Sequence, residues 1–223
     1  MTIRAEEVNT MRALQGLESS SSSVRLRAAL AVGTAADSRS VDTLIKRCAV
    51  EPDFHVRDML TWALTRHSSS VTVPKLIDAL GSERAQARSQ ALHTLSKVGD
   101  RQAWPAITRA LLTDADDEVA RSAWRAAVVL VPEDGGQADL AEVLATQLGR
   151  GGRETQLSLS RALVALGEAV TPALRAAMAD PAPRVLEHAI ATERLLRDPD
   201  AGFGFAIEEA KRIVSLGASA REE

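Results

Sequence analysis

The stretch DFHVRDMLTWAL, residues 53–64, places Val56, Leu60 and Leu64 on one face of a helix. Asp58 and Trp62 are four residues apart, so they share another face of the same helix. The stretch is therefore either a small functional constellation or one line of a repeated structural pattern. The rest of the chain favours the repeated pattern, because the same spacing of apolar residues returns along the sequence.

Six segments align with this stretch, and they begin at intervals of 32, 31, 32, 36 and 30 residues. Their first residues are Val24, Val56, Ala87, Val119, Thr155 and Val185. Four positions later each segment has a second apolar residue, namely Ala28, Leu60, Ala91, Ala123, Leu159 and Ala189. Eight positions later five segments have a third, whereas the last has Glu193. This spacing predicts six helices that each bury one face.

A second apolar segment precedes each of the later five helices, for example VPKLIDALG and WPAITRALLT. Pro74, Pro105 and Pro172 stand near the starts of three of them, where a missing N–H costs nothing. Short links rich in Asp, Ser and Gly separate the segments, and no segment alternates at the period of a strand. Each pair of helices would bury its apolar face only by stacking on the next pair.

We therefore predict an all-α fold, an α-solenoid of about six helical hairpins in a single domain over residues 1–223. The predicted repeats span residues 8–37, 40–69, 71–100, 103–132, 138–168 and 170–198, and a capping helix follows at 203–217. The fifth repeat departs most, because Thr155 and Gln156 replace Val-Arg and the link before it is longer. Gly135–Gly136 in that link is a candidate bend.

The phrase D-x-x-V-R, seen at Asp53, Val56 and Arg57, resembles the second-helix signature of HEAT repeats, including the phycobilisome-lyase type. The resemblance runs from about residue 8 to 198 and implies that the second helices line a concave surface. Their solvent-facing positions, two and six residues after each segment start, then define a candidate interaction surface. It comprises Asp58, Trp62, His93, Arg121, Arg125 and Arg161.

Other residues in these helices are expected to be structural. Arg25, Arg57 and Arg88 follow the segment starts directly and are expected to bridge repeats through carbonyls or carboxylates. Trp124 is expected at a seam between helices. Cys48 is the only cysteine, so it forms no internal disulfide, and its amphipathic surroundings predict a buried thiol.

Composition narrows the range of functions. The net charge is −3 and the pI about 5.9, so the chain as a whole is not a polyanion binder. No stretch approaches the ~18 apolar residues of a membrane span, and the start lacks the apolar core of a signal peptide. We expect a cytoplasmic protein with no membrane partner. Arginine supplies 23 of the 27 basic residues, which indicates a GC-rich bacterial genome.

Three functional hypotheses follow from this pattern. The sequence lacks nucleotide-binding, hydrolase and metalloprotease motifs, and its four histidines are not paired at helical spacing, so we expect no catalytic, cofactor-binding or metal-binding residues. The first hypothesis is a non-catalytic scaffold or adaptor that binds another protein or peptide. The second is nucleic-acid binding, because one class of bacterial DNA glycosylases uses HEAT-like repeats with Trp, Asp and Arg on the inner face. The third is a subunit of a chromophore lyase.

Overall fold

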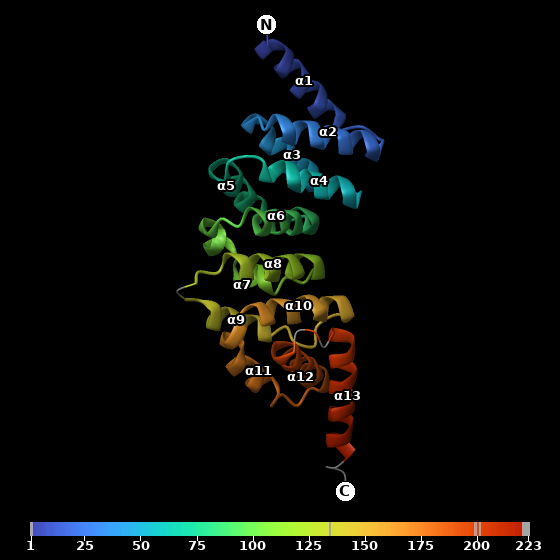
Figure 1. The fold of residues 1–223 in the computed structure, drawn as a ribbon, viewed down its shortest axis with the longest axis vertical. Helices are drawn as coiled ribbons and strands as arrows, with labels where there is room; N and C mark the ends of the chain where they lie inside the picture. The colour runs from blue at the N-terminus through green and yellow to red at the C-terminus, as the bar shows by residue number, and fades with distance from the viewer. Residues whose placement is uncertain (1, 134, 199, 201, 220–223) are drawn as a thin grey trace. The chain divides into compact units, whose positions relative to one another are not determined.

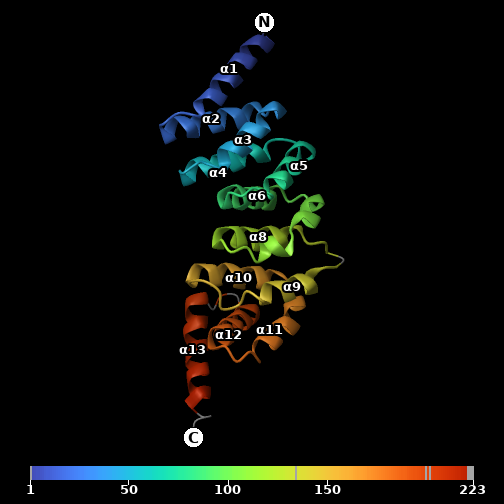
Figure 2. The ribbon, with the colours of Figure 1, turned by 180° about the vertical axis from the view of Figure 1, so that it is seen from behind.

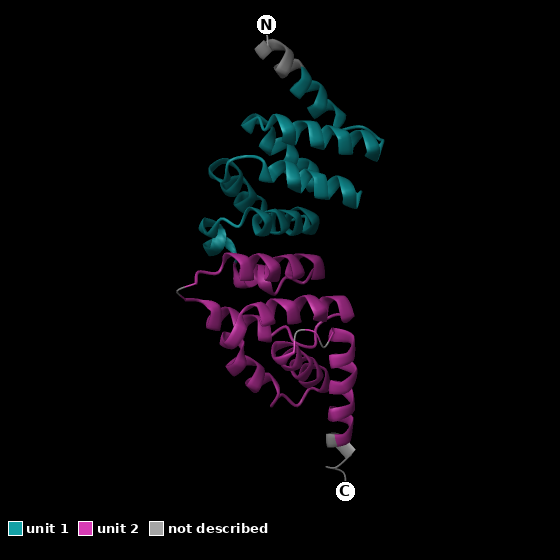
Figure 3. Ribbon diagram, viewed as in Figure 1, with its two compact units in different colours: residues 1–107 teal, residues 108–223 magenta. Residues whose placement is uncertain are grey.

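The computed structural model describes residues 2–133, 135–198, 200 and 202–219. The chain divides into two compact units, residues 1–107 and residues 108–223, and each is described by itself (Figure 3). The described residues fold into α-helices and short 3-10 helices, and no strand occurs among them. The predicted all-α fold is confirmed.

Unit 1 contains three helical hairpins, in which α2, α4 and α6 form one row and α3 and α5 lie beside it (Figures 1 and 2). The bounds are α1 Thr2–Gly16, α2 Ser22–Ala35, α3 Val41–Cys48, α4 Phe54–Thr65, α5 Ser69–Ala79 and α6 Ala85–Val98. A 3-10 turn at Ser38–Ser40 precedes α3, and another at Arg101–Ala106 follows α6.

The second helix of the second repeat, α4, shows why the sequence folds in this way. The Asp53 carboxylate caps α4 by accepting the Val56 N–H at 3.1 Å. Val56, Leu60 and Leu64 are each at most 1% exposed and form the apolar face that the sequence spacing predicts. Because α4 packs on α2 before it and on α6 after it, each row helix buries its face against its neighbours.

Unit 2 repeats this arrangement with α8, α10 and α12 in its row and α9 and α11 beside it. The bounds are α7 Arg109–Leu112, α8 Asp117–Leu130, α9 Gln137–Ala145, α10 Arg153–Ala165, α11 Thr171–Ala177, α12 Pro183–Arg197 and α13 Phe203–Ser219. A 3-10 turn at Gly167–Val170 leads into α11. The longer link before α9 ends at Gly136, whose φ of 90° favours glycine.

Two of the predicted first helices differ from the sequence prediction. WPAITRALLT is not one helix of three turns, because a 3-10 turn ends at Ala106 and the four-residue α7 begins at Arg109. Pro105 supplies no N–H, and Thr108 accepts the Leu111 N–H to start a new helix. Pro74 lies inside α5 rather than at its start, whereas Pro172 does occupy the first turn of α11.

The C-terminal helix α13 covers the apolar face of the last repeat, as predicted for a cap. Phe203, Ala206, Ile207 and Ala210 of α13 are buried in one cluster with residues of α12, including Ala191. The predicted apolar face of this helix extends too far, because Ile213 is 51% exposed. Contact with the rest of unit 2 therefore depends on the first half of α13.

Candidate functional site

The α4 helix of unit 1 carries a stripe of exposed side chains at Phe54, Asp58 and Trp62, each four residues from the next. Phe54 is 66% exposed and Trp62 is 38% exposed. The sequence prediction that Asp58 and Trp62 face solvent on the second helix agrees with this exposure. Two of the three exposed side chains are large and aromatic, which is typical of side chains that anchor protein interfaces.

Trp62 also has a packing role. The Trp62 ring lies against Gly33 of α2, because a Cβ atom at position 33 would stand 2.6 Å from Cζ3 of the ring and 2.7 Å from the Ala63 Cα. Glycine at this position therefore allows α2 and α4 to approach closely. Trp62 therefore packs between repeats while 38% of it stays exposed, and its place in a binding surface stays a prediction.

The same surface continues on the neighbouring row helices of unit 1. Leu30 of α2 occupies the position equivalent to Trp62 and is 45% exposed. His93 occupies that position on α6 and is half-buried. Leu30, Asp58, Trp62 and His93 are named the unit 1 row face from here on.

In unit 2, the predicted surface residues are three arginines with different partners. Arg121 of α8 is half-buried and pairs with Glu118 at 2.7 Å and with Glu154 at 3.7 Å. Arg125 is exposed and donates to the Ser122 hydroxyl at 3.0 Å. Arg161 of α10 is exposed. The six predicted residues thus fall into two groups in two units, and a continuous surface through all six stays a prediction.

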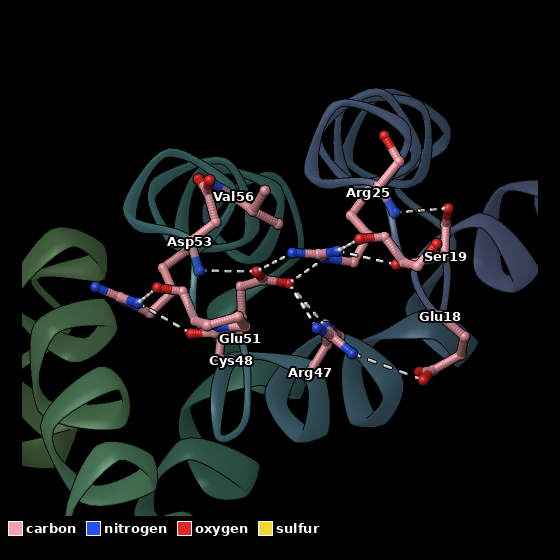
Figure 4. Close-up of polar contacts among 12 residues, drawn as sticks. Glu18, Ser19, Arg25, Arg47, Cys48, Glu51, Asp53 and Val56 are labelled. Atoms are coloured by element: carbon pink, nitrogen blue, oxygen red, sulfur yellow. Dashed lines mark hydrogen bonds and ion pairs between the residues drawn. The ribbon is translucent and has the colours of Figure 1, made fainter.

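A buried ion-pair network in unit 1 was not predicted (Figure 4). The Glu51 carboxylate, in the loop between α3 and α4, is fully buried and accepts two hydrogen bonds of 2.7 Å from the Arg25 guanidinium of α2. It also accepts bonds from Arg47 and from the Asp53 N–H. Burial disfavours its charged form, yet the bonds from Arg25, Asp53 and Arg47 outweigh burial and lower the pKa of Glu51 to about 2.

The backbone of this loop is bound from both sides. Arg25 donates to the Ser19 and Ser20 carbonyls as well as to Glu51, so it bridges two repeats as predicted. Gln86 of α6 donates to the carbonyls of Cys48 and Glu51 at 2.9 and 2.8 Å. Arg57, by contrast, binds carbonyls in its own repeat, at Glu51 and Pro52, rather than bridging. Arg88 donates to the Ser82 and Glu83 carbonyls of the loop before its own helix.

In unit 2 a buried histidine of the next row helix binds the loop between α9 and α10. His188 of α12 is fully buried, and its Nδ1 accepts the Gly149 N–H at 3.0 Å. The imidazole proton therefore lies on Nε2, which is 3.0 Å from the Gln156 carbonyl and 2.9 Å from the Ser160 hydroxyl. Burial lowers the pKa of His188 to about 4, opposed by the bond to Gln156. The side chain is neutral at neutral pH and has a structural role.

Trp124 and Cys48 are structural as well. The Trp124 ring is fully buried and its Nε1 donates to the Leu112 carbonyl at 2.8 Å, which confirms the prediction of a helix seam. The Cys48 thiol is buried, as predicted, and burial raises its pKa to about 12, so it is a poor nucleophile.

No group of three or more His, Cys, Asp or Glu side chains within the described residues is arranged to hold a metal ion. None of the helices in the described part of the chain is by itself long and apolar enough to cross a membrane. Residues 153–165 and 167–177 meet that test only when they are joined across a bend of 119°.

Comparison with known proteins identifies the repeat. The sequence model of HEAT repeats matches residues 10–86 and 49–128, which together span residues 10–128, more than half of the chain. The chain belongs to the HEAT-repeat family, and the resemblance seen in the sequence is confirmed.

The solved structures that are similar to this chain include the following two. The complex of CpcE and CpcF of phycocyanin lyase from Nostoc sp. PCC7120 has 20% identity and a TM-score of 0.47, over 86% of this chain and 78% of that chain. Human deoxyhypusine hydroxylase in complex with glycerol has 16% identity and a TM-score of 0.49, over 96% of both chains. No curated protein sequence matches the chain.

Proposed function

We propose that the chain is a non-catalytic interaction module, in which the unit 1 row face binds a helical segment of a partner protein. The observation that supports this proposal is the exposure of Leu30 and Trp62, at 45% and 38%, at equivalent positions on adjacent helices. Exposed apolar side chains on neighbouring helices are typical of surfaces that a partner covers.

The C-terminal helix supplies an internal precedent for a helical partner. Ala191 of α12 holds the position equivalent to Leu30 and Trp62, and α13 buries it completely. A helix therefore packs on a row helix at this position in unit 2, while the equivalent position in unit 1 is open. The partner chemistry that fits unit 1 is an amphipathic helix with apolar anchors for Leu30 and Trp62 and a basic residue for Asp58.

The test is recovery of partners from the native host with variants that keep the fold. Leu30→Gln and Asp58→Arg change exposed helix positions and are expected to reduce recovery of a specific partner by about tenfold. Val50→Ala removes an apolar side chain that is 47% exposed but lies after α3, away from the row face, and serves as the matched control. Equal recovery with all three variants contradicts the proposal.

Nucleic-acid binding is the competing outcome. Arg121 is engaged by Glu118 and Glu154, which reduces the positive charge that it offers to phosphates. A fluorescence anisotropy titration with duplex and single-stranded DNA is expected to show no saturable binding. Salt-sensitive binding that Arg121→Ala with Arg125→Ala abolishes would replace the protein-binding proposal with a nucleic-acid one.

A further inference from the structure

A pocket of about 300 Å³ opens on the surface of unit 2, where α10, α12 and α13 meet. This volume is at the lower end of the range for small-molecule pockets, roughly 300–1,000 Å³. Each of the three helices contributes one cation to the lining, Arg153 from α10, Arg184 from α12 and Lys211 from α13. Nothing in the helical repeat itself requires three cations from three different helices to line one space.

The cations differ in how far their charge is already balanced. Lys211 pairs with Glu208 of the same helix at 2.9 Å. Arg184 donates to the Gly151 carbonyl at 2.8 Å, which holds its guanidinium at the cavity wall and leaves its formal charge unpaired. Arg153 also lies near Glu208, whose pKa is lowered mainly by Lys211 and to a smaller extent by Arg153. The lining holds two carboxylates, Glu187 and Glu208, so its three cations leave a net charge of one positive unit.

Glycines shape the cavity around Arg153. The Arg153 guanidinium lies directly over Gly204 in the first turn of α13, in the space that a Cβ at position 204 would occupy. Gly151 and Gly152 precede α10, and no side chain caps the start of that helix. The first-turn N–H groups of α10 therefore add to the positive potential at the same wall.

We propose that this cavity binds a small molecule that carries a phosphate group, with Arg153 and Arg184 as its main ligands. Guanidinium groups bind phosphate oxygens through two parallel hydrogen bonds, and the three lining cations exceed the two lining carboxylates by one positive charge. Gln156 and Ile207 line the rest of the space and would contact the remainder of the molecule. This site lies in unit 2 and does not depend on the proposed function of the unit 1 row face.

The test is isothermal titration of the full chain with inorganic phosphate and with O-phosphoserine, against sodium chloride at equal ionic strength. Both phosphate compounds are expected to bind saturably, and chloride is not. Binding of phosphoserine more tightly than phosphate assigns the site to a phosphate ester, and equal binding assigns it to free phosphate; both support the proposal. Absence of saturable binding of either compound overturns it.

Four variants separate a built site from general charge attraction. Arg153→Gln is expected to weaken phosphate binding by about tenfold or more, whereas Arg175→Gln, an exposed arginine of α11 outside the lining, changes it less than about twofold. Glu187→Gln removes one of the two carboxylate charges in the lining and is expected to strengthen binding by roughly threefold.

Gly204→Ala is the sharpest of these variants, because it keeps every charge and only displaces the Arg153 guanidinium from its place over α13. Alanine also favours a helix more than glycine, so α13 is not weakened by propensity. We expect binding to weaken by about threefold to tenfold. Equal weakening by Arg153→Gln and Arg175→Gln, with no effect of Gly204→Ala, overturns the proposal in favour of unspecific attraction.

Discussion

Two loops of this protein are each held by a buried polar side chain, which is charged in unit 1 and neutral in unit 2. Residues 49–53 of unit 1 and residues 146–152 of unit 2 each join the first helix of a repeat to the second. The first loop is bound by Arg25 of α2 and Gln86 of α6, from the repeats before and after it. The second is bound to Asp117 of α8 through Arg150, and to His188 of α12.

The group buried at the centre differs between the loops. In unit 1 it is the Glu51 carboxylate, which two guanidinium groups keep ionised. In unit 2 it is the His188 imidazole, which is neutral and accepts a backbone N–H. The comparison shows that the buried hydrogen-bonding group that holds such a loop can be either charged or neutral. We therefore expect loss of the carboxylate to destabilise unit 1, and protonation of the histidine to destabilise unit 2.

The largest expected effect is the loss of the buried carboxylate in unit 1. Glu51→Ala leaves the Arg25 guanidinium, only 6% exposed, without its counter-charge, and we expect a loss of about 3–5 kcal/mol in the stability of unit 1. Hydrogen exchange of peptides from α2 and α4, measured by mass spectrometry under native conditions, reports this loss directly.

The matched control for Glu51→Ala is Glu83→Ala, in the corresponding loop before α6, where the side chain is exposed. We expect this change to alter exchange by less than about 0.5 kcal/mol. A loss below about 1 kcal/mol for Glu51→Ala would show that Arg25 binds water or another acceptor instead. The charge of Glu51 would then add no more to stability than a neutral group does.

Much of the fold was predictable, because the spacing of apolar residues recurs in each repeat. Val56, Leu60 and Leu64 mark the buried face of α4, and the pattern that they define gives the positions of the other row helices. The break before α7 was missed, since the apolar run WPAITRALLT conceals the 3-10 turn that ends at Ala106.

The buried hydrogen bonds that hold the two loops were not predictable from the apolar spacing. Glu51 and Arg25 are 26 positions apart, and a glutamate in a turn-forming EPD link gives no sign that it is buried. No sequence pattern around His188 predicts its hydrogen bond to Gly149, which is 39 positions away. For the candidate surface, helical position correctly indicated that Asp58 and Trp62 are exposed, but it could not indicate the closeness of Trp62 to Gly33.

The second prediction uses pH to distinguish the contribution of His188 to stability from that of Glu51. The pKa of His188 is lowered from 6.5 to about 4, so the unfolded chain binds the proton more tightly than the folded one does. Stability from this neutral histidine is complete above pH 6.5 and is lost as the pH falls toward 4, by about 3 kcal/mol in total. Glu51 loses its contribution only between pH 4.5 and about 2.

Hydrogen exchange at pH 7 and pH 5, corrected for the intrinsic rate, should therefore show α10 and α12 loosening in wild type. A His188→Gln variant should lose this pH response. Burial also lowers the pKa of His67 in unit 1, so a His67→Gln background removes its contribution from the comparison. If α10 and α12 keep the same protection at both pH values, then His188 is not the neutral group that its hydrogen bonds indicate.

The smallest expected effect comes from an ion pair that joins repeats on the outside of unit 1. Asp42 of α3 and Lys75 of α5 are paired, but their side chains are 57% and 35% exposed. Lys75→Met keeps the length of the side chain and is expected to cost less than about 0.5 kcal/mol in urea denaturation, because water and salt screen exposed pairs. The pair spans two repeats, as the pair of Arg25 and Glu51 does, so the contrast isolates burial as the variable. A cost above about 1 kcal/mol would contradict this expectation. It would show that an ion pair between repeats stabilises unit 1 even where water is not excluded.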